Sequence, residues 1–559
     1  MNNKLKASAM DSVTELQPKI KRARSTFNLG IKHYTSFNLG ELFVVDFTEV
    51  LPGDTFNVNL NSFIRLTSTA KRATMDNLHA DLYAFFCPYR FLDKAWVNIQ
   101  GESSDPWYTA PGSCSRIGIS GDGSPSLGIE AGSLLNQLGL PIGTITGPSG
   151  SHFWFNAYPV LTYFKLINDW FRDQNLQAEI PFDTTNGDYD VITDIAQING
   201  AYINEKGSLF KVAKYHDLFT SALPAPQKGP AVSLLKAEGK APVGIIPASS
   251  GTTSTSYPVG LGSGVSVTAN KLQQITMYGG SGEKVVADVA EAYVTTINEL
   301  RLAFQLQKAY ELDARSGTRY TEALEARFDV KNPDLRLGRS ELLGHYRFDL
   351  NMAELASTTN SGTSGATIAD LKGSSYINGV GAGASKTGNS QHICVKTFLE
   401  HGIFMIVGCI RPDLTYQQGI DKFWRKKERW DFYEPIFSNI GEVPIMKSEL
   451  YPVDYALETD DSVFGYQEAW YDYRYKVSKI SGCLASDSNE GFDIFHYGQD
   501  FNSAPVLSST FIQQDKAALD RTLAFTSSAV DQFIAQFQGV IKATRVMPLF
   551  SVPGLIDHF

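Results

Sequence analysis

Apolar residues alternate with other residues on both sides of a tight turn close to the N-terminus. In residues 40–66, GELFVVDFTEVLPGDTFNVNLNSFIRL, the alternation runs up to Pro52-Gly53-Asp54 and resumes after it. A period of two places every second side chain on the same face, which is the pattern of a half-buried strand. Pro, Gly and Asp together are typical of a turn. The segment therefore predicts two antiparallel strands paired through the turn, in a protein whose core is built from sheets.

Two denser apolar runs extend this prediction. DLYAFFCPYRFL (81–92) and HGIFMIVGCIRP (401–412) contain few polar residues, as strands that are buried on both faces do. The 559 residues include 25 Tyr, 34 Phe and 47 Gly, a composition that favours aromatic-rich strands joined by glycine turns. The predicted fold class is mainly β, with a few helices.

Two segments carry apolar residues at helical spacing. They are YPVLTYFKLINDWFRDQ (158–174) and VTTINELRLAFQLQKAYELDARSG (294–317). In the second segment Ile297, Leu300 and Phe304 share one side of the helix. We expect this helix to pack on the body of the protein by that apolar face.

Charge and composition divide the chain into an arm and a body. Residues 1–39 are interpreted as an N-terminal basic arm, because residues 1–26 carry six cations against two carboxylates in a chain of net charge −10. Residues 40–559 are expected to form one domain with large insertions. Stretches rich in Gly, Ser and Pro are interpreted as surface insertions, at about residues 112–151, 228–288 and 357–390.

The tetrapeptide Phe-Asn-Leu-Gly occurs twice, at residues 27–30 and 37–40. A repeat protein needs several copies at a fixed period, and the sequence has no third copy. The stretch is therefore not one unit of a repeat protein.

Known catalytic and ligand-binding patterns are absent from the sequence. There is no HExxH pattern and no serine with glycine at both −2 and +2, and GVGAGASKTG (379–388) lacks the first glycine of a phosphate-binding loop. The nine histidines show no paired metal-ligand spacing, and the five cysteines include no CxxC pair. We predict no catalytic, cofactor-binding or metal-binding residues, and no enzyme activity.

The same sequence predicts a protein that is made and stays soluble in a cytoplasm. The N-terminus has no apolar stretch of the kind found in signal peptides, and the longest apolar run (402–410) has about half the length of a membrane span. We expect free thiols and no membrane insertion.

Two basic stretches are candidates for contact with nucleic acid. KIKRAR (19–24) places four cations on the arm, where they could neutralise phosphates. DKFWRKKERWDFYEP (421–435) interleaves cations with aromatic residues, as sequence-tolerant single-strand surfaces do. The alternative in each case is a solvated segment, or ion pairs to a neighbouring acidic face. The candidate DNA-binding residues are Lys19, Lys21, Arg22, Arg24, Arg425, Lys426 and Lys427.

Eight longer motifs resemble the major capsid proteins of the Microviridae, in the gokushovirus branch. They occur in the order of that family, from about residue 25 to residue 559. In this sequence they read TSFNLGELFVVDFTEVLPGDTFNVNL, MDNLHADLYAFFCPYRF, NDWFRDQNLQ, SALPAPQKGPAV, LDARSGTRYTE, RPDLTYQQG, VFGYQEAWYDYRYKVSKISG and RVMPLFSVPGLIDHF.

The resemblance implies an eight-stranded antiparallel jelly roll with long loop insertions. It also implies that the second Phe-Asn-Leu-Gly copy opens the entry strand before the turn at residues 52–54, and that the first is an accidental near-copy on the arm. It also implies assembly through pentamers into a T=1 icosahedral shell around a circular single-stranded DNA genome, without catalysis. The implied partners are other copies of the chain, the genome, a small basic DNA-binding protein, an internal scaffolding protein and a pilot protein. The protein is accordingly expected in the virion, and in the host cytoplasm during assembly.

By position, residues 228–288 match the insertion that forms protrusions at the three-fold axes in the resembling capsids. We expect this insertion to contact a receptor on the bacterial surface, with residues 357–390 as a second candidate. Two other classes of protein remain as alternatives. A carbohydrate-binding, lectin-like jelly roll would also suit aromatic β surfaces with long loops, whereas a jelly-roll enzyme of the cupin type would need a metal cluster that the sequence does not show.

Overall fold

The computed structural model describes the chain between residues 24 and 550, with gaps. The residues outside the description within that range are 69, 73, 95 and 332, and the segments 101–113, 121–127, 145–151, 181–187, 191–208, 230–242, 247–283, 288–296, 317–319, 354–375, 379–390, 453–461 and 489–490. The chain divides into two compact units, one made of Met1–Pro224 with Arg319–Phe559 and the other of Ala225–Thr318.

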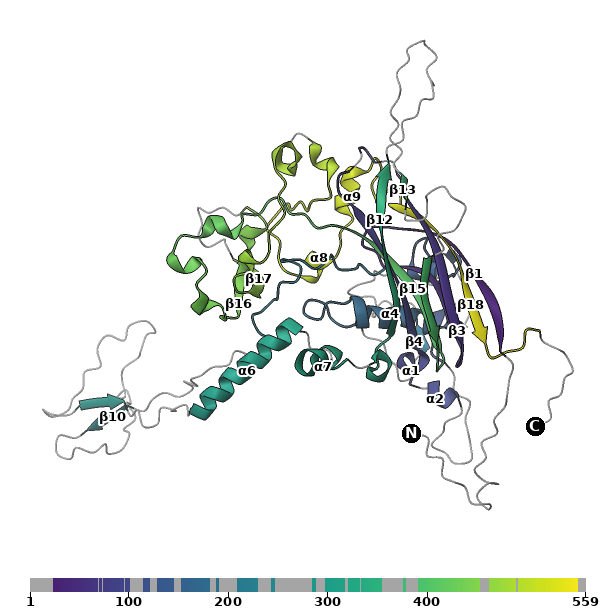
Figure 1. Ribbon diagram of the computed structural model, residues 1–559, viewed down its shortest axis with the longest axis horizontal. Coiled ribbons are helices and arrows are strands. Elements are labelled where there is room, and N and C mark those ends of the chain that lie inside the picture. The colour runs from purple at the N-terminus through teal and green to yellow at the C-terminus, as the bar shows by residue number, and fades with distance from the viewer. Residues whose placement is uncertain are drawn as a thin grey trace, which may run out of the picture. The chain divides into compact units, whose positions relative to one another are not determined.

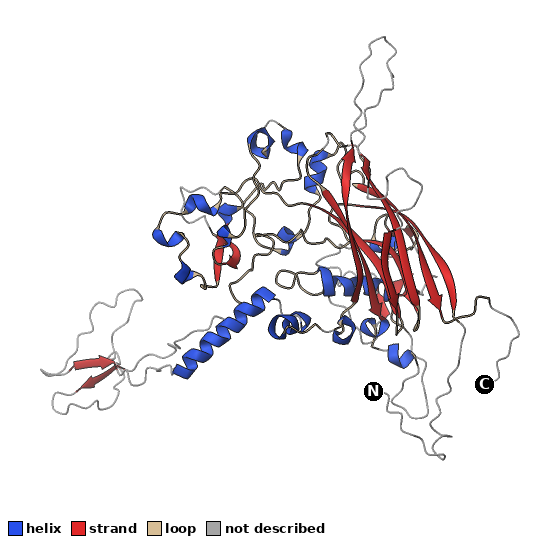
Figure 2. Ribbon diagram, viewed as in Figure 1, coloured by secondary structure: helices blue, strands red, loops and turns tan. Residues whose placement is uncertain are grey.

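Two antiparallel sheets form the framework of the first unit (Figures 1 and 2). One sheet has the order β1 (Ser25–Phe37), β18 (Phe533–Arg545), β3 (Thr55–Leu66) and β14 (Gln391–Thr397). The other has the order β13 (Tyr376–Asn378), β12 (Glu341–Ala353), β4 (Leu78–Pro88), β15 (Gly402–Pro412) and β2 (Phe43–Val50).

The connectivity of these sheets is that of a jelly roll. Eight of the described strands have seven residues or more. When these are numbered in chain order, the two sheets read 1-8-3-6 and 5-4-7-2. Apart from the fourth and fifth, which pair within one sheet, successive strands cross between the sheets, as in the two Greek keys of a jelly roll. The predicted fold class is confirmed.

The strands on either side of the Pro52-Gly53-Asp54 turn belong to different sheets. β2 pairs with β15, whereas β3 pairs with β18 and β14. The predicted pairing of these two strands with each other is therefore wrong. Alternation fixes which face of a strand is buried but says nothing about the neighbouring strand.

The turn itself forms as predicted. The Asp54 amide donates to the Leu51 carbonyl at 3.0 Å, and Gly53 has a φ of 88°. A side chain is strained at such a φ, which explains the glycine. The Gly53 amide donates to the Phe398 carbonyl, and the buried Asp54 carboxylate lies 3.2 Å from Arg545 Nε. The corner between the sheets is therefore anchored to the residue that follows β14 and to β18.

Residues 25–37 form a strand, so the arm expected to reach residue 39 ends earlier. β1 pairs with β18 along its whole length, from Ser25 opposite Arg545 to Phe37 opposite Phe533. The first Phe-Asn-Leu-Gly copy lies inside this edge strand, and its interpretation as part of a loose arm is wrong. The alternation of Phe27, Leu29 and Ile31 was the signal for a strand.

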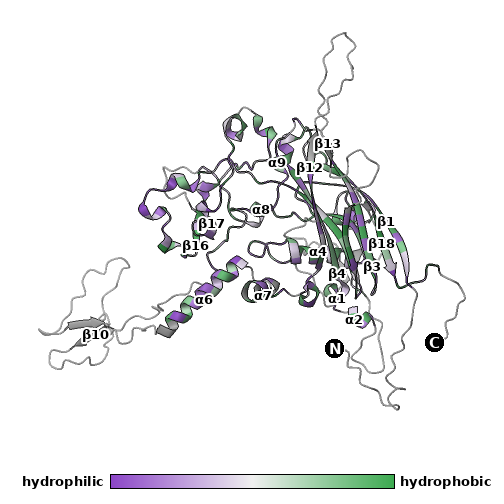
Figure 3. Cartoon of the chain, in the orientation of Figure 1, coloured by the Kyte–Doolittle hydropathy of each residue, from purple (hydrophilic) through white to green (hydrophobic). Residues whose placement is uncertain are grey.

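Aromatic rings stack on one another within the core between the sheets. The Phe37 ring stacks on Phe43 with 3.9 Å between centroids, and Phe43 in turn lies 5.6 Å from Phe537. Towards the other end of the sandwich, Phe56 meets the edge of Phe404 at 5.9 Å. Figure 3 shows hydrophobic and hydrophilic residues alternating along β3. The apolar half of the alternation therefore faces the second sheet.

A helical layer covers the outer face of the sheet that contains β4 and β15 (Figure 1). It consists of α4 (Tyr158–Leu166), which continues as the π-helical turn Ile167–Phe171. Phe171 meets the edge of Tyr83 at 5.5 Å, and Trp170 lies 5.6 Å from Phe85. The predicted helix over 158–174 is confirmed, and so is the burial of these two strands on both faces.

Shorter elements complete the described chain. The remaining helices of the first unit are α1 (Tyr89–Leu92), α2 (Trp96–Ile99), α3 (Leu134–Gln137), α7 (Tyr320–Phe328), α8 (Ser509–Ile512) and α9 (Ala517–Thr522). Its remaining strands are β5 (Arg116–Ser120), β6 (Gly128–Ile129), β7 (Gly143–Thr144), β8 (His152–Asn156), β9 (Asp188–Asp190), β16 (Glu442–Met446) and β17 (Val463–Glu468).

The second unit contains α6 (Ile297–Ser316) and an antiparallel pair, β10 (Val243–Ile246) and β11 (Lys284–Ala287). The predicted helix is confirmed. Phe304, expected in its packed face, has 59% of its surface exposed, and the packing of this helix on the body of the protein stays a prediction. Most of the predicted insertions 228–288 and 357–390 lies outside the described residues. Most of the predicted insertion 112–151 is described, and Ile129, Leu134 and Leu135 of this segment are buried in the main core.

A buried carboxylate ties three strands of the second sheet together. The Asp81 side chain on β4 has no exposed surface and accepts hydrogen bonds from Arg411 at 2.7 Å, Arg347 at 2.7 Å, Tyr215 at 2.8 Å and His345 at 3.0 Å. Burial alone would raise the pKa of Asp81, but the bonds from Arg347 and Arg411 outweigh it and hold that pKa well below its usual range. The charged form is therefore part of the folded state.

We predict that Asp81→Asn lowers the free energy of unfolding by about 3 kcal/mol or more, because it leaves the Arg411 guanidinium buried without its carboxylate. Urea denaturation of the purified chain measures this change. The control is Asp413→Asn, which removes a 60%-exposed carboxylate 3.2 Å from His79 and should cost less than about 1 kcal/mol. Equal losses in the two variants would contradict the prediction.

The difference in stability between the wild type and Asp81→Asn should depend on pH. The stabilisation from a carboxylate of lowered pKa is complete above its unfolded pKa of about 3.9 and is lost as the pH falls through the folded pKa. The stability difference between the wild type and Asp81→Asn should therefore shrink as the pH falls below about 4.

Candidate functional site

A second, smaller core in the first unit supports the basic segment 421–435. It is formed by residues from 218–222, 416–471 and 511–512. Phe219 meets the edge of Tyr416 at 4.9 Å, and Phe464 meets Phe511 at 5.0 Å. The β16–β17 hairpin contributes Ile445 and Phe464 to this core. The loops on top of it are therefore attached to a packed base.

Short hydrogen-bonded turns shape the segment itself. Asp421 begins the 3₁₀ turn Lys422–Arg425 by accepting the Phe423 amide at 3.0 Å. Asp431 accepts the amides of Lys427 and Glu428 at 2.8 Å each. These backbone bonds lower the pKa of Asp431 and keep it charged. The segment thus has a defined backbone rather than the form of a loose basic tail.

Two of the three candidate DNA-binding cations in this segment form ion pairs inside the subunit. Arg425 Nη2 lies 2.9 Å from Glu449 Oε1, and Arg425 Nη1 donates to Ser448 Oγ at 2.8 Å. Lys426 pairs with Asp472, and its side chain is only 6% exposed. Ion pairing to a neighbouring acidic face, the alternative considered for this stretch, therefore describes both residues. Lys427 is exposed.

The acidic partners are themselves part of a network. The Tyr471 hydroxyl donates to the buried Glu449 carboxylate at 2.8 Å, and Lys422 lies 3.7 Å from Asp472. Burial raises the pKa of Glu449, and the bond from Tyr471 and the charge of Arg425 oppose that shift. Neither carboxylate could be assigned to the basic segment from the sequence, because both come from later in the chain.

The aromatic residues of the segment point away from the core. Phe423 is 62% exposed, Trp424 75% and Trp430 54%. The sequence prediction had interpreted them as stacking partners for bases. It did not single out the continuation of this surface in Phe432, Tyr433 and Ile436, although the string DFYEPIF was visible in the sequence.

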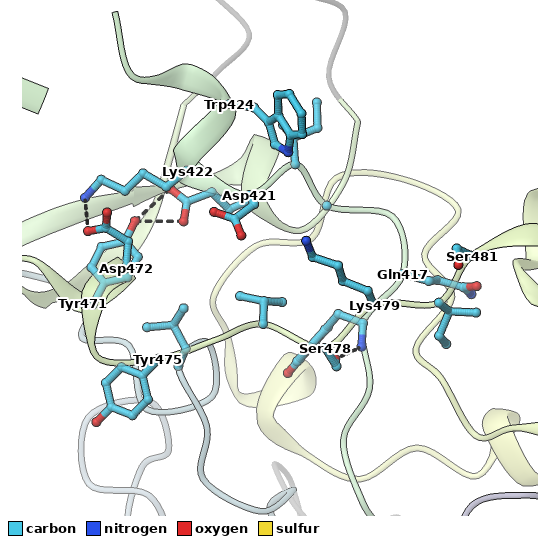
Figure 4. A pocket seen from close by; sticks show the side chains of 17 residues that line it. Gln417, Asp421, Lys422, Trp424, Tyr471, Asp472, Tyr475, Ser478, Lys479 and Ser481 are labelled. Atoms are coloured by element: carbon cyan, nitrogen blue, oxygen red, sulfur yellow. Dashed lines mark hydrogen bonds and ion pairs between the residues drawn. The ribbon is translucent and has the colours of Figure 1, made fainter. Parts of the chain in front are cut away.

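Two cavities border the segment. One, of about 330 Å³, lies between Asp421, Trp424, Tyr475 and Lys479, and in Figure 4 the Lys479 side chain points into it. The other, of about 340 Å³, is lined by Trp430 and Trp470 among others. Hydroxyls, amides and charged side chains line the first cavity.

One of the four candidate DNA-binding residues on the arm lies among the described residues. Lys19, Lys21 and Arg22 lie outside the described residues. Arg24, immediately before β1, is exposed and donates from Nη2 to the Gly53 carbonyl. The chain therefore enters the jelly roll beside the turn at residues 52–54.

Within the described ranges, no group of three or more His, Cys, Asp or Glu side chains is placed to hold a metal ion. Among the helices that the structure describes, none is long and apolar enough to cross a bilayer. The five cysteines are free, with Cys87, Cys394 and Cys409 buried and Cys483 exposed.

Comparisons with known proteins agree with the fold. Three curated relatives, each named capsid protein VP1, match almost the whole chain. The protein of Bdellovibrio phage phiMH2K is 32% identical over 561 residues, covering 97% of both chains. That of Spiroplasma virus 4 is 33% identical over 562 residues, covering 95% of both. That of Chlamydia phage 1 is 29% identical over 590 residues, covering 95% of this chain and 96% of its own.

Residues 17–555 also match the family described as capsid protein (F protein). The match includes both sheets, the core beneath the basic segment and the second unit. The resemblance to Microviridae capsid proteins is thereby confirmed. The chain belongs to the phage capsid protein (F protein) family, and it is a structural protein rather than an enzyme.

Proposed function

We propose that this chain is the major capsid subunit that assembles, through pentamers, into a T=1 icosahedral shell around a circular single-stranded DNA genome. The observation that carries the proposal is the near-complete match, in both directions, to proteins named capsid protein VP1. The jelly roll supports it, because eight strands closed into two sheets make a rigid tile whose loops are free to vary. Family membership favours this function over the lectin-like alternative.

The proposal has a direct test in the size of the assembled material. Expression together with the other structural proteins of the phage should yield closed particles of megadalton mass, because symmetric assembly repeats the same contacts on every copy. Mass measurement and electron microscopy check this. A stable monomer or small oligomer as the only product would contradict it.

The arm supplies a contact for the genome in this proposal. Six cations against two carboxylates in residues 1–26 give a net charge of +4 in a chain of net charge −10. A basic segment facing inwards would neutralise phosphates, while an acidic exterior would keep particles apart. A small basic DNA-binding protein would share this role. Arg24 anchors the start of β1 to Gly53, so Lys19, Lys21 and Arg22 are the better residues to change.

We predict that Lys19→Gln, Lys21→Gln and Arg22→Gln together weaken binding of single-stranded DNA without altering the fold. Loss of three phosphate contacts should reduce the slope of log affinity against log salt by about 2. Titration of DNA at several salt concentrations measures the slope, and the DNA content of particles is a second readout. The charge-conserving control is Lys19→Arg with Lys21→Arg. An unchanged slope in the neutral variant would overturn this role.

The insertion at 228–288 is proposed as the three-fold protrusion that contacts a bacterial surface receptor, with 357–390 as a second candidate. Two observations support this proposal: the position of the insertion in the chain, and the strand pair from which it extends. β10 and β11 pair in antiparallel register, with Ile246 opposite Lys284, so the segment between them leaves and returns at one place. Such a loop can vary without disturbing the jelly roll.

This register defines a precise deletion. We predict that replacing residues 247–283 with Asn-Gly, which closes a two-residue hairpin, leaves particle yield intact but lowers adsorption to host cells by about tenfold or more, through lost contacts worth about 1.4 kcal/mol. Adsorption assays on purified particles measure the effect. A scrambled 247–283 of equal length is the control for sequence. Normal adsorption by the deleted particles would contradict receptor contact.

The remaining partners follow from the same proposal. An internal scaffolding protein would hold subunits in position before the shell closes, and a pilot protein would accompany the genome. Assembly would take place in the host cytoplasm, and the finished chain would be found in the virion.

A further inference from the structure

We infer that the exposed aromatic face of the segment 423–436 is a contact surface for a second copy of this chain. The inference rests on the proposed assembly and assigns part of it to named residues. We call this face the aromatic surface and define it by six exposed side chains: Phe423, Trp424, Trp430, Phe432, Tyr433 and Ile436.

The size of the aromatic surface is the first argument. The exposed fractions of its six side chains range from 47% at Phe432 and Tyr433 to 86% at Ile436. Aromatic side chains have areas of roughly 150–250 Å² each, so the exposed total is about 700 Å². One partner of a standard protein interface contributes about 800 Å². The area therefore fits one half of a subunit contact.

The rigidity of the segment is the second argument. The ion pairs of Arg425 with Glu449 and of Lys426 with Asp472 fix its backbone to the second core. The Tyr433 amide donates to the Tyr473 hydroxyl at 3.3 Å. A surface that is already ordered loses less conformational entropy when a partner binds. The buried charges thus act by holding the aromatic side chains in place.

Charge distinguishes a protein partner from nucleic acid. Residues 421–435 contain five cations and four carboxylates, a net charge of +1. With Glu449 and Asp472, the partners of Arg425 and Lys426, the net becomes −1. A phosphate backbone requires free cations, and within residues 421–435 the exposed cations are Lys427 and Arg429, of which Arg429 pairs with Glu434. Aromatic residues at the centre with mixed charges around them are the composition of a protein interface.

A cavity beside the aromatic surface offers a place for an inserted side chain. It has a volume of about 340 Å³, and Trp430, Phe437, Ile440 and Trp470 supply its apolar wall. The Trp470 indole donates to the Phe437 carbonyl at 2.8 Å, which fixes that wall. Dominant interface residues characteristically fill desolvated pockets of this kind. An apolar side chain of the neighbouring copy is the occupant that these walls suit.

The test compares two phenylalanines of equal exposure. Phe423 belongs to the aromatic surface and is 62% exposed, whereas Phe525 lies beyond β17 in the chain, after α9, and is 65% exposed. Phe423→Ser should lower the yield of particles from infected cells by about tenfold or more, as loss of an interface anchor does, while Phe525→Ser should leave the yield within about twofold. Circular dichroism of the soluble subunit checks that both variants fold.

A second readout is oxidative footprinting of Trp424 and Trp430 in wild-type protein. Both should be protected in empty shells as well as in filled ones, relative to dissociated subunits. Protection only in DNA-filled particles would overturn the inference in favour of nucleic acid. Equal yields for Phe423→Ser and Phe525→Ser, or exposed tryptophans in all particles, would overturn it while leaving the capsid function intact. Failure of the wild type to form particles would instead reject the proposed function.

Discussion

Closure of two sheets around an aromatic core is the interaction on which the rest of the structure depends. Phe37, Phe43 and Phe537 come from β1, β2 and β18, and their rings stack between the sheets. Because β1 and β18 are the first and last long strands, the core cannot close until nearly the whole chain is present. The fold tolerates long segments between the strands, as long as each segment returns to the sandwich. This explains how the fold accommodates insertions such as 228–288.

The sequence indicated which side chains are buried, but it did not indicate which strands pair with each other. Alternation around residues 52–54 identified β2 and β3 and their buried faces, yet each pairs with strands from distant parts of the chain. The same limit applies to β1, whose alternation was visible but whose partner β18 lies about five hundred residues away. Strand pairing depends on closing long loops and on competition among many similar apolar faces, and no local pattern records its outcome.

The candidate site shows the same division. Cations and aromatics in 421–435 were recognised as a functional surface, but the partners of Arg425 and Lys426 lie 24 and 46 residues further along. Without Glu449 and Asp472 the segment looks basic, and single-stranded DNA is the natural ligand to expect. With them it is close to neutral and mainly apolar. The ligand expected for this surface therefore depends on where the two buried carboxylates lie, although the exposed residues are the same in either case.

Internal pairing of charge also bears on why such a chain assembles. Charged residues make up 19% of the sequence. Several of them form ion pairs inside the subunit, among them Asp81, Asp54, Glu449 and Asp472. Each buried pair removes a cation and a carboxylate from the surface, and the surface that remains is richer in exposed aromatic side chains. The net charge of the subunit is unchanged by this pairing, but the apolar share of the surface available for contact is increased. The ionic networks that fix the fold of one subunit thereby favour its association with the next.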